Sequence, residues 1–381
     1  MATKLKIGLV LDDTLDKPDG VQQYVLSMGE WLASEGHEVH YLVGETTRTD
    51  LPNIHSLARN VHVRFNGNRL SVPLPASKKH IRGLLATEQF DVLHVQTPYS
   101  PFLAHRIILA APAGTAVVGT FHIVAYSRLV ELATRLLALW VHKSLKRFDQ
   151  IMSVSSAAVT YSRKTFGIET TISPNVIDYP RFAGAQGFEK YDDNTRTILF
   201  LGRLVPRKGC KVLLEAVAEL AQDATLPAFR VLVCGKGPLD DELKGFVAAN
   251  NLGDFVEFTG FVEEADKPRY YASADISVFP SSGGESFGIV LLEAMASGKA
   301  AVLGGDNSGY RSVLEPEPHL LFNPHDAKQL AQKLRELLTN PTLRQQKANW
   351  GKAYTANFDV KTVGNQLVDI YIQALRKRRS Q

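Results

Sequence analysis

The chain has 381 residues, a length at which one hydrophobic core usually divides into two domains. Hydrophobic residues make up 45% and charged residues 22%, a balance that suits packed cores and excludes an intrinsically disordered chain. The net charge is +4, and the only two cysteines are too few for a disulfide framework or a thiolate metal cage. No uncharged apolar run reaches about 18 residues and a strand pattern follows the N-terminus directly, so we expect a cytoplasmic protein without a spanning helix or secretory signal.

The first half of the chain alternates short β-branched runs with helical patterns, as expected of a parallel sheet covered by helices. Strands are predicted at 6–11, 38–43, 91–95, 116–121 and 150–154, and the clearest helices at 21–34 and 128–145. The pattern then breaks into PNVIDYPRFAGAQGFEKYDDNT, which is rich in Pro, Gly and Asp and indicates a linker.

A second alternating series predicts a second parallel sheet. Its strands are expected at 197–201, 230–233, 256–258, 276–279 and 300–303, with helices at 209–222, 239–250, 267–273 and 287–297 and helical sequence beyond 326. Open parallel sheets bind ligands at the carboxyl ends of their strands, so we expect an active site in a cleft between two such domains.

The most informative motif is GGESFGIVLLEAMASG at 283–298. It places Glu285 on a loop and Glu293 about two turns into a helix, so that both carboxylates can face one ligand. The free N–H groups at the helix start form an anion site, and they belong to Ser286, Phe287, Gly288 and Ile289. The alternative is an ordinary helix with an acidic first turn.

Three other segments fall at predicted strand ends. Arg203 and Lys208 in GRLVPRKG offer cations for a phosphate, or are simply charges on a surface loop. Gly20 in KPDGVQQY leaves room for a phosphate or sugar at a helix start. His122 in GTFH can bind a substrate hydroxyl, or is a buried structural histidine.

Several common sites are missing from the sequence. The chain has neither the P-loop pattern GxxxxGK[ST] nor the full dinucleotide fingerprint, which argues against P-loop ATP hydrolysis and hydride transfer. It also lacks HExxH, DxD and Cys/His ligand spacing. We therefore expect a site without a metal or cofactor.

Positive charge is concentrated in one part of the chain. Lys and Arg minus Asp and Glu gives 7 − 9 = −2 for residues 1–76 and 11 − 4 = +7 for residues 77–164. Within SKKHIRGLLATEQF, Lys78, Lys79 and Arg82 precede apolar residues and predict a basic amphipathic helix that contacts an anionic membrane. The alternative is a solvated charged face, and we expect no nucleic-acid partner.

Taken together, these motifs resemble the retaining glycosyltransferases of family four, which have the two-lobed GT-B fold. GRLVPRKG, FTGFVEEADK and the 283–298 motif occur in the family's usual order. Within the family the chain is most similar to phosphatidylinositol mannosyltransferases, through DGVQQYVLSMGEWLASEGHEV, QFDVLHVQTPYSP and GTFH. The resemblance implies an α/β fold of two Rossmann-like domains facing across a cleft, with C-terminal helices crossing back. Residues 1–176 would bind the acceptor and 177–358 the nucleotide-sugar donor, while 359–381 would pack on the N-terminal domain.

The resemblance also implies roles for the donor residues. Arg203 and Lys208 would neutralise the donor diphosphate, and the N–H groups after Glu285 would hold the sugar-phosphate end. Glu285 would bind sugar hydroxyls and Glu293 the ribose. Glu264 and Lys267 match positions that read the base, where a carboxylate can accept from guanine, so GDP-mannose is the expected donor.

The N-terminal lobe would complete the site. Gly20 and His122 would lie near the transferred sugar, and the acceptor would be a lipid or glycolipid at the inner face of the cell membrane. Gln22 and Asn66 would contact the acceptor or only stabilise turns. Arg203, Lys208 and the helix start would supply the positive potential that a metal supplies elsewhere.

Departures from the family pattern keep other functions open. Asp19 replaces the first of two usual glycines, and HVQTP lacks the family's acidic residue. One alternative is a UDP-sugar-dependent transferase for another glycolipid or polysaccharide precursor, and another is an inactive nucleotide-sugar-binding protein. A sugar phosphorylase is disfavoured because nothing resembles a lysine-bound pyridoxal site. The sequence leaves the oligomeric state open.

Overall fold

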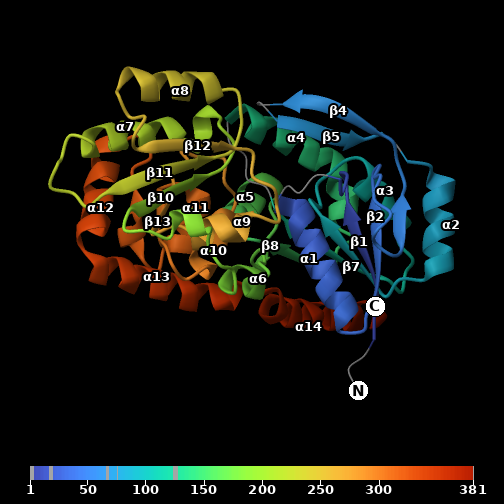
Figure 1. Cartoon of the computed structure of the whole chain (residues 1–381). Helices are drawn as coiled ribbons and strands as arrows, with labels where there is room; N and C mark the ends of the chain where they lie inside the picture. The colour runs from blue at the N-terminus through green and yellow to red at the C-terminus, as the bar shows by residue number, and fades with distance from the viewer. Residues whose placement is uncertain (1–3, 17–19, 66–67, 75, 123–127, 381) are drawn as a thin grey trace. The chain divides into compact units, whose positions relative to one another are not determined.

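The computed structural model describes residues 4–16, 20–65, 68–74, 76–122 and 128–380, without the side chains of 62–72 and 123–133 (Figure 1). Asn66 therefore lies outside the described residues. The chain divides into two compact units, Met1–Val176 with Val360–Gln381, and Ile177–Asp359. We refer to them as unit 1 and unit 2.

Unit 1 is built on a seven-stranded parallel sheet with the order β3-β2-β1-β6-β7-β8-β9. Its central strands are apolar and buried on both faces, as parallel strands between two helical layers are. The strands are β1 (Lys6–Leu11), β2 (Glu38–Val43), β3 (Ile54–Ser56), β6 (Val92–Gln96), β7 (Ala116–Phe121), β8 (Gln150–Ser153) and β9 (Thr171–Ile172). A separate antiparallel pair, β4 (Asn60–Phe65) and β5 (Asn68–Pro73), was not predicted.

Two helical layers cover this sheet. One core contains residues of α1 (Gly20–Ser34) and α14 (Val360–Arg379), and the other contains residues of α2 (Lys78–Glu88) and α3 (Leu103–Ala110). The remaining described helices are α4 (Arg128–Leu145) and α5 (Ser156–Phe166). In Figure 1, α14 lies beside α1, against which it packs. A Cβ on Gly364 would come within 2.3 Å of the Trp31 ring, so only glycine allows this close helix contact.

Unit 2 repeats the architecture with a six-stranded parallel sheet of order β12-β11-β10-β13-β14-β15. Its strands are β10 (Arg196–Leu201), β11 (Phe229–Cys234), β12 (Val256–Gly260), β13 (Ile276–Phe279), β14 (Ala301–Gly305) and β15 (Leu321–Phe322). Its helices are α6 (Tyr179–Ala183), α7 (Cys210–Leu220), α8 (Asp240–Ala249), α9 (Lys267–Ala272), α10 (Ile289–Ala296), α11 (Ser308–Leu314), α12 (Ala327–Thr339) and α13 (Pro341–Thr355), and 3₁₀ turns lie at Glu189–Tyr191, Pro206–Lys208, Pro318–Leu320 and Ala356–Phe358.

The prediction of two Rossmann-like sheets is confirmed, and two local predictions are corrected. The boundary between the units falls within the segment predicted as a linker, but the part from Ile177 on is folded into unit 2, where Phe182 and Tyr191 are buried. Helix α10 begins at Ile289 instead of Phe287, because Gly288 has a φ of +115° and cannot be helical. None of the described helices is long and apolar enough to cross a bilayer.

The strand orders fix where each unit can bind a ligand. In unit 1 the chain reverses its direction of progress across the sheet between β1 and β6, and in unit 2 it does so between β10 and β13. Loops leave the two neighbouring strands in opposite directions at such a point and open a crevice at the carboxyl edge of the sheet. Of the predicted site residues, Gly20 follows β1, Arg203 and Lys208 follow β10, and Glu285 follows β13.

Candidate active site

In unit 2, the loops that follow β10 and β13 are joined by hydrogen bonds. The Ser282 N–H donates to the Arg207 carbonyl over 2.9 Å, and the Ser281 hydroxyl donates to the same carbonyl over 3.1 Å. Gly209 has a φ of +71°, and a Cβ there would lie 2.1 Å from the Pro280 carbonyl oxygen. The loop of residues 202–209 is therefore held tightly against the carboxyl end of β13.

Glu285 is the centre of a charged cluster at this switch point. Its Oε1 lies 2.7 Å from Arg207 Nη1 and 2.8 Å from Lys208 Nζ, and it accepts from the Ser281 hydroxyl over 2.9 Å. Burial acts to raise the pKa of Glu285, but Lys208 and Arg207 outweigh it, so the pKa is lowered. The carboxylate is thus ionised and held in place.

Arg203 lies apart from this cluster. Its side chain is exposed, and among the described residues it has no ion-pair or hydrogen-bond partner. The structure therefore brings Lys208, but not Arg203, to Glu285. Arg203 is a guanidinium that remains available to an anion.

Asn307 holds the Glu285 loop from the other side. It is the N-cap of α11, where its Oδ1 accepts from the N–H groups of Gly309 and Tyr310, and its Nδ2 donates to the Ser281 carbonyl over 2.9 Å. A Cβ on Gly309 would lie 2.2 Å from the Glu285 carbonyl oxygen. The start of α11 therefore packs directly on the backbone of Glu285.

The N-terminus of α10 comes next in the chain after Glu285. No side chain caps this helix, and Phe287 just before it is buried. A Cβ on Gly288 would come within 2.7 Å of the Tyr310 ring, so the turn into the helix is built for glycine. Helix N-terminal N–H groups without a side-chain cap favour an anion. Ser286 and Ile289 flank Phe287 and Gly288 in this turn.

Glu293 is buried on α10, about one turn from the helix start instead of the predicted two, because the helix begins at Ile289. The Tyr271 hydroxyl donates to its Oε2 over 3.0 Å. Burial raises the pKa of Glu293, although Lys267 acts in the opposite direction. The two glutamates of the motif therefore differ, since the pKa of Glu285 is lowered and that of Glu293 is raised.

Glu264 and Lys267 form a smaller group near Glu293. Lys267 Nζ lies 2.5 Å from Glu264 Oε2, and Arg181 Nη1 lies 3.4 Å from Glu264 Oε1. Arg181 also donates to the Glu264 carbonyl. The structure thus places these two predicted residues together and adds Arg181, which comes from the segment predicted as a linker.

His122 follows β7 in unit 1 and is buried. Its Nε2 lies 2.6 Å from Gln96 Oε1, so Nε2 carries the proton if the amide oxygen accepts. Burial lowers the pKa of His122 to about 3, although Asn175 favours the charged form. Buried polar atoms without a hydrogen-bond partner gather around this ring within the described residues, namely His122 Nδ1, Gln96 Nε2, Asn175 Oδ1 and the hydroxyl of Tyr24, whose ring centroid lies 4.9 Å from that of His122.

Gly20 and Gln22 lie at the start of α1. A Cβ on Gly20 would meet nothing within 4 Å, so packing does not require glycine there. Gln22 is buried, and its Nε2 donates to Asp13 Oδ2 over 3.1 Å. Gln22 therefore braces the loop after β1. In the same loop, burial raises the pKa of Asp12 to about 6.

Comparison with known proteins decides the family. The model described as Glycosyltransferase Family 4 matches residues 18–181, and that described as Glycosyl transferases group 1 matches 186–354. A phosphatidyl-myo-inositol mannosyltransferase of Mycobacterium tuberculosis is 33% identical over 96% of both chains. The chain belongs to glycosyltransferase family four. A more distant relative, 24% identical over 97% of this chain and 98% of its own, is a GDP-mannose-dependent monoacylated alpha-(1-6)-phosphatidylinositol monomannoside mannosyltransferase of Corynebacterium glutamicum.

Solved structures agree with this family-four glycosyltransferase in fold. A glycosyltransferase from Rickettsia africae superimposes with a TM-score of 0.77 at 18% identity, over 98% of this chain and 99% of its own. An Anabaena protein in complex with UDP and glucose gives 0.70 at 17% identity, over 96% and 99%. The structural likeness shows the GT-B fold, and the chain is a glycosyltransferase by family.

The structure adds residues of this glycosyltransferase that the sequence did not single out. Arg207 shares the GRLVPRKG motif with the two predicted cations, and only the structure shows that it pairs with Glu285. Asn307 follows β14 and precedes Ser-Gly, which is a helix-start signal that could have been found. Gln96 closes β6 within the HVQTP stretch, but its pairing with His122 depends on strand neighbours distant in sequence.

The basic helix of the glycosyltransferase is α2. Ser77 caps it by accepting from the His80 N–H, and Lys78, Lys79 and Arg82 are exposed. Ile81 and Leu85 are buried in the core below. The helix is amphipathic as predicted, but most of its apolar face is used for packing within unit 1.

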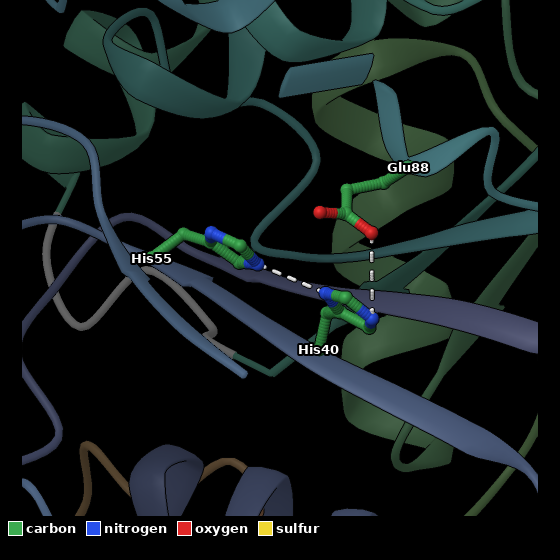
Figure 2. A group of neighbouring side chains, drawn as sticks. All are labelled: His40, His55 and Glu88. Carbon is green, nitrogen blue, oxygen red and sulfur yellow. Dashed lines mark hydrogen bonds and ion pairs between the residues drawn. The ribbon is translucent and has the colours of Figure 1, made fainter. Parts of the chain in front are cut away.

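A cluster of potential metal ligands lies elsewhere in unit 1 (Figure 2). His40 Nδ1 lies 2.9 Å from His55 Nε2, and His40 Nε2 lies 3.8 Å from Glu88 Oε2. Lys6 Nζ is 2.6 Å from the same Glu88 oxygen and 2.8 Å from Glu38 Oε1. Because Lys6 pairs with both Glu38 and Glu88, we assign the cluster to an ion-pair network that joins β1, β2 and α2.

Proposed function

We propose that the chain transfers mannose from GDP-mannose to a phosphatidylinositol-type lipid at a membrane surface, with retention of configuration. The named relatives support the donor and the acceptor class. The observation that carries the proposal is the Glu285 cluster, in which an ionised carboxylate and two cations meet at the switch point of unit 2 beside an uncapped helix start. Such a site offers cations to a diphosphate and a carboxylate to sugar hydroxyls.

The leaving group sets the electrostatic requirement. When the bond between the sugar C1 and the phosphate oxygen breaks, the nucleoside diphosphate gains negative charge, which fixed cations must stabilise. Lys208 has three N–H donors and can contact Glu285 and a phosphate together, and the exposed Arg203 can add a bidentate contact. The N–H groups at the start of α10 would hold the phosphate next to the sugar. No metal or cofactor is needed in this proposal.

Retention follows from attack on the face that the diphosphate leaves. The acceptor oxygen bonds to C1 as the phosphate oxygen departs, and the acceptor proton passes to that phosphate oxygen. No covalent bond to the enzyme is required. In this scheme Glu285 would accept from the sugar hydroxyls, and the buried Glu293 would bind the ribose.

The group of Glu264, Lys267 and Arg181 is proposed to bind the base. A carboxylate has room for about four hydrogen bonds, so Glu264 can keep its two cations and still accept from the N–H groups of guanine. Uracil offers a single N–H on its ring and satisfies such an acceptor less completely. This difference supports GDP over UDP.

Unit 1 is proposed to bind the transferred sugar and the acceptor through neutral groups. When the Nε2–H of neutral His122 donates to Gln96 Oε1, its Nδ1 is unprotonated. This Nδ1 would therefore accept a hydrogen bond from a hydroxyl. Asn175 Oδ1 offers a second acceptor nearby. Gly20 would let the sugar approach the start of α1.

The test is transfer of radiolabelled mannose from GDP-mannose to vesicles that contain phosphatidylinositol, with UDP-glucose in parallel and EDTA added to both. We expect a labelled lipid only with GDP-mannose, unchanged by EDTA, with the same anomeric configuration as the donor. Consumption of the UDP-sugar alone would support the other transferase. Donor binding without hydrolysis or transfer to any acceptor would support an inactive binding protein.

A further inference from the structure

Helix α4 exposes large apolar side chains. Leu136, Leu139 and Trp140 are 65%, 77% and 64% exposed. They are spaced i, i+3 and i+4, so they lie on one side of the helix. Val141, by contrast, is fully buried on the opposite side. The helix therefore has apolar side chains both on the face that packs against unit 1 and on the face that is exposed to solvent.

The exposed patch continues onto α3. The His105 ring stacks on the Trp140 ring with centroids 5.9 Å apart, and His105 Nδ1 lies 2.9 Å from the Ser144 hydroxyl. Leu109, one turn beyond His105, is 52% exposed. We name this surface, made of Leu109, Leu136, Leu139 and Trp140, the α3–α4 face. Because α3 and α4 pack against each other, the face is one continuous part of unit 1.

Positive charge borders the α3–α4 face. Exposed Arg135, Lys143 and Lys146 lie on α4 or directly after it. The sequence of α4 contains one acidic residue, Glu131. Helix α2 packs on α3 and exposes its own basic side chains. Apolar side chains within a basic border are complementary to an anionic lipid surface. The apolar side chains can enter the boundary of the acyl chains, and the basic side chains are attracted to the anionic headgroups.

We infer that the α3–α4 face docks on an anionic phospholipid bilayer, with Leu136, Leu139 and Trp140 entering the headgroup and acyl boundary. A second copy of the chain is a poorer occupant. A twofold contact would set the basic border against itself, and like charges across an interface oppose association. This inference rests on the proposed function, because an enzyme that acts on a lipid acceptor must reach a bilayer.

The inference also changes which helix anchors the protein. On α2, Ile81 and Leu85 are in the core, so Lys78, Lys79 and Arg82 can attract anionic lipid but Ile81 and Leu85 cannot enter it. Attraction by exposed charges alone is screened by salt. The α3–α4 face adds apolar burial, which salt does not screen, so binding through it persists at high ionic strength.

Binding can be followed with the full chain, without nucleotide, on vesicles of phosphatidylglycerol and phosphatidylcholine. We expect Trp140 fluorescence to shift to shorter wavelength and to be quenched by brominated acyl chains, and Trp140→Phe to remove most of that signal. The double variant Leu136→Asn/Leu139→Asn should weaken vesicle binding about a hundredfold, at about tenfold per side chain. Lys78→Glu/Lys79→Glu, the control on α2, should lower binding only at low salt.

Two readouts keep the inference separate from the proposed reaction. The double variant should unfold at the wild-type temperature and hydrolyse GDP-mannose at the wild-type rate, since its changes are on an exposed face. Unquenched Trp140, or vesicle binding unaffected by the double variant, would overturn the docking surface even if mannose transfer is observed. A wild-type dimer in light scattering that the double variant converts to a monomer would also overturn it, in favour of a second copy.

Discussion

Each unit places a cluster of polar residues at the carboxyl ends of its strands, yet the two clusters have opposite character. In unit 2, Glu285 is ionised between two cations, and its pKa is lowered. In unit 1, His122 is neutral among uncharged amides and phenols, with its pKa lowered to about 3. One fold therefore holds both the charged cluster that we propose for a departing diphosphate and the neutral cluster that we propose for hydroxyl groups.

The largest effect should come from removing a cation of the charged site. Lys208→Ala is expected to lower kcat by about a hundredfold or more, equivalent to about 3 kcal/mol, because the diphosphate loses a charge in the transition state. Initial rates of GDP-mannose turnover measure this. The matched control is Lys211→Ala, three residues further on, which breaks an exposed pair with Glu242 and should leave kcat unchanged. Equal losses in both variants would contradict the assignment of Lys208.

The next largest effect should distinguish the glycine at the start of α10 in unit 2 from the glycine at the start of α1 in unit 1. Gly288→Ala is expected to destabilise the protein by about 3 kcal/mol, because φ is +115° and the new Cβ would collide with Tyr310. Gly20→Ala meets no neighbour and should leave the free energy of unfolding nearly unchanged while raising KM for the donor. Urea unfolding and steady-state kinetics on both variants measure this. A normal KM in Gly20→Ala would remove Gly20 from the site.

Acid should destabilise the neutral site. His94 and His122 both have a folded-state pKa of about 3, whereas an unfolded histidine titrates near 6.5. As pH falls below about 6.5, these histidines take up a proton in the unfolded chain but stay neutral in the folded one. The free energy of unfolding therefore falls by about 2 kcal/mol per histidine at pH 5. Asp12, with a pKa of about 6 against about 3.9 unfolded, offsets about 1 kcal/mol of this loss.

Urea unfolding at pH 7 and pH 5 measures the acid effect. His122→Gln should reduce the difference in free energy between the two pH values by about 2 kcal/mol. If the variant and the wild type lose the same free energy of unfolding between pH 7 and pH 5, His122 is charged in the folded state at pH 5.

The smallest effect is expected at Gln96, the neutral side chain next to His122, and it tests whether Gln96 positions the His122 ring. Gln96→Glu would put a carboxylate 2.6 Å from Nε2, and an anion there should raise the pKa of His122 and shift the pH profile of kcat to higher pH. Gln96→Ala should cost about tenfold in rate without that shift, because the ring loses its orienting contact. A pH profile that neither variant alters would show that Gln96 does not position His122.

The fold was predictable because its strands are long, buried and separated by clear helices, as β1 and β10 show. The sequence does not predict the hairpin of β4 and β5, because its strands NVHVRF and NRLSVP contain no apolar run long enough to stand out. The segment with Phe182 reads as a linker because it is rich in Pro, Gly and Asp, although two aromatic side chains anchor it in the core. Local composition does not show such tertiary packing.

The candidate site was predictable where one motif carries it and not where partners come from distant strands. Glu285 and Lys208 belong to recognisable segments, whereas the contacts of Gln96 and Asn307 depend on strand order. The same limit applies to membrane contact. Basic residues on α2 stand out in the sequence, but helical periodicity cannot show that α4 leaves Leu139 uncovered.

The discontinuity of unit 1 has a consequence for synthesis on the ribosome. Residues 177–359 are contiguous, so unit 2 can complete its core as soon as they emerge. Unit 1 must wait for α14, whose Tyr371 hydroxyl lies 2.7 Å from His94 Nδ1 in the buried core. The nascent N-terminal segment thus stays incomplete while the whole of unit 2 is translated, and the apolar side chains that α14 covers stay exposed for that time.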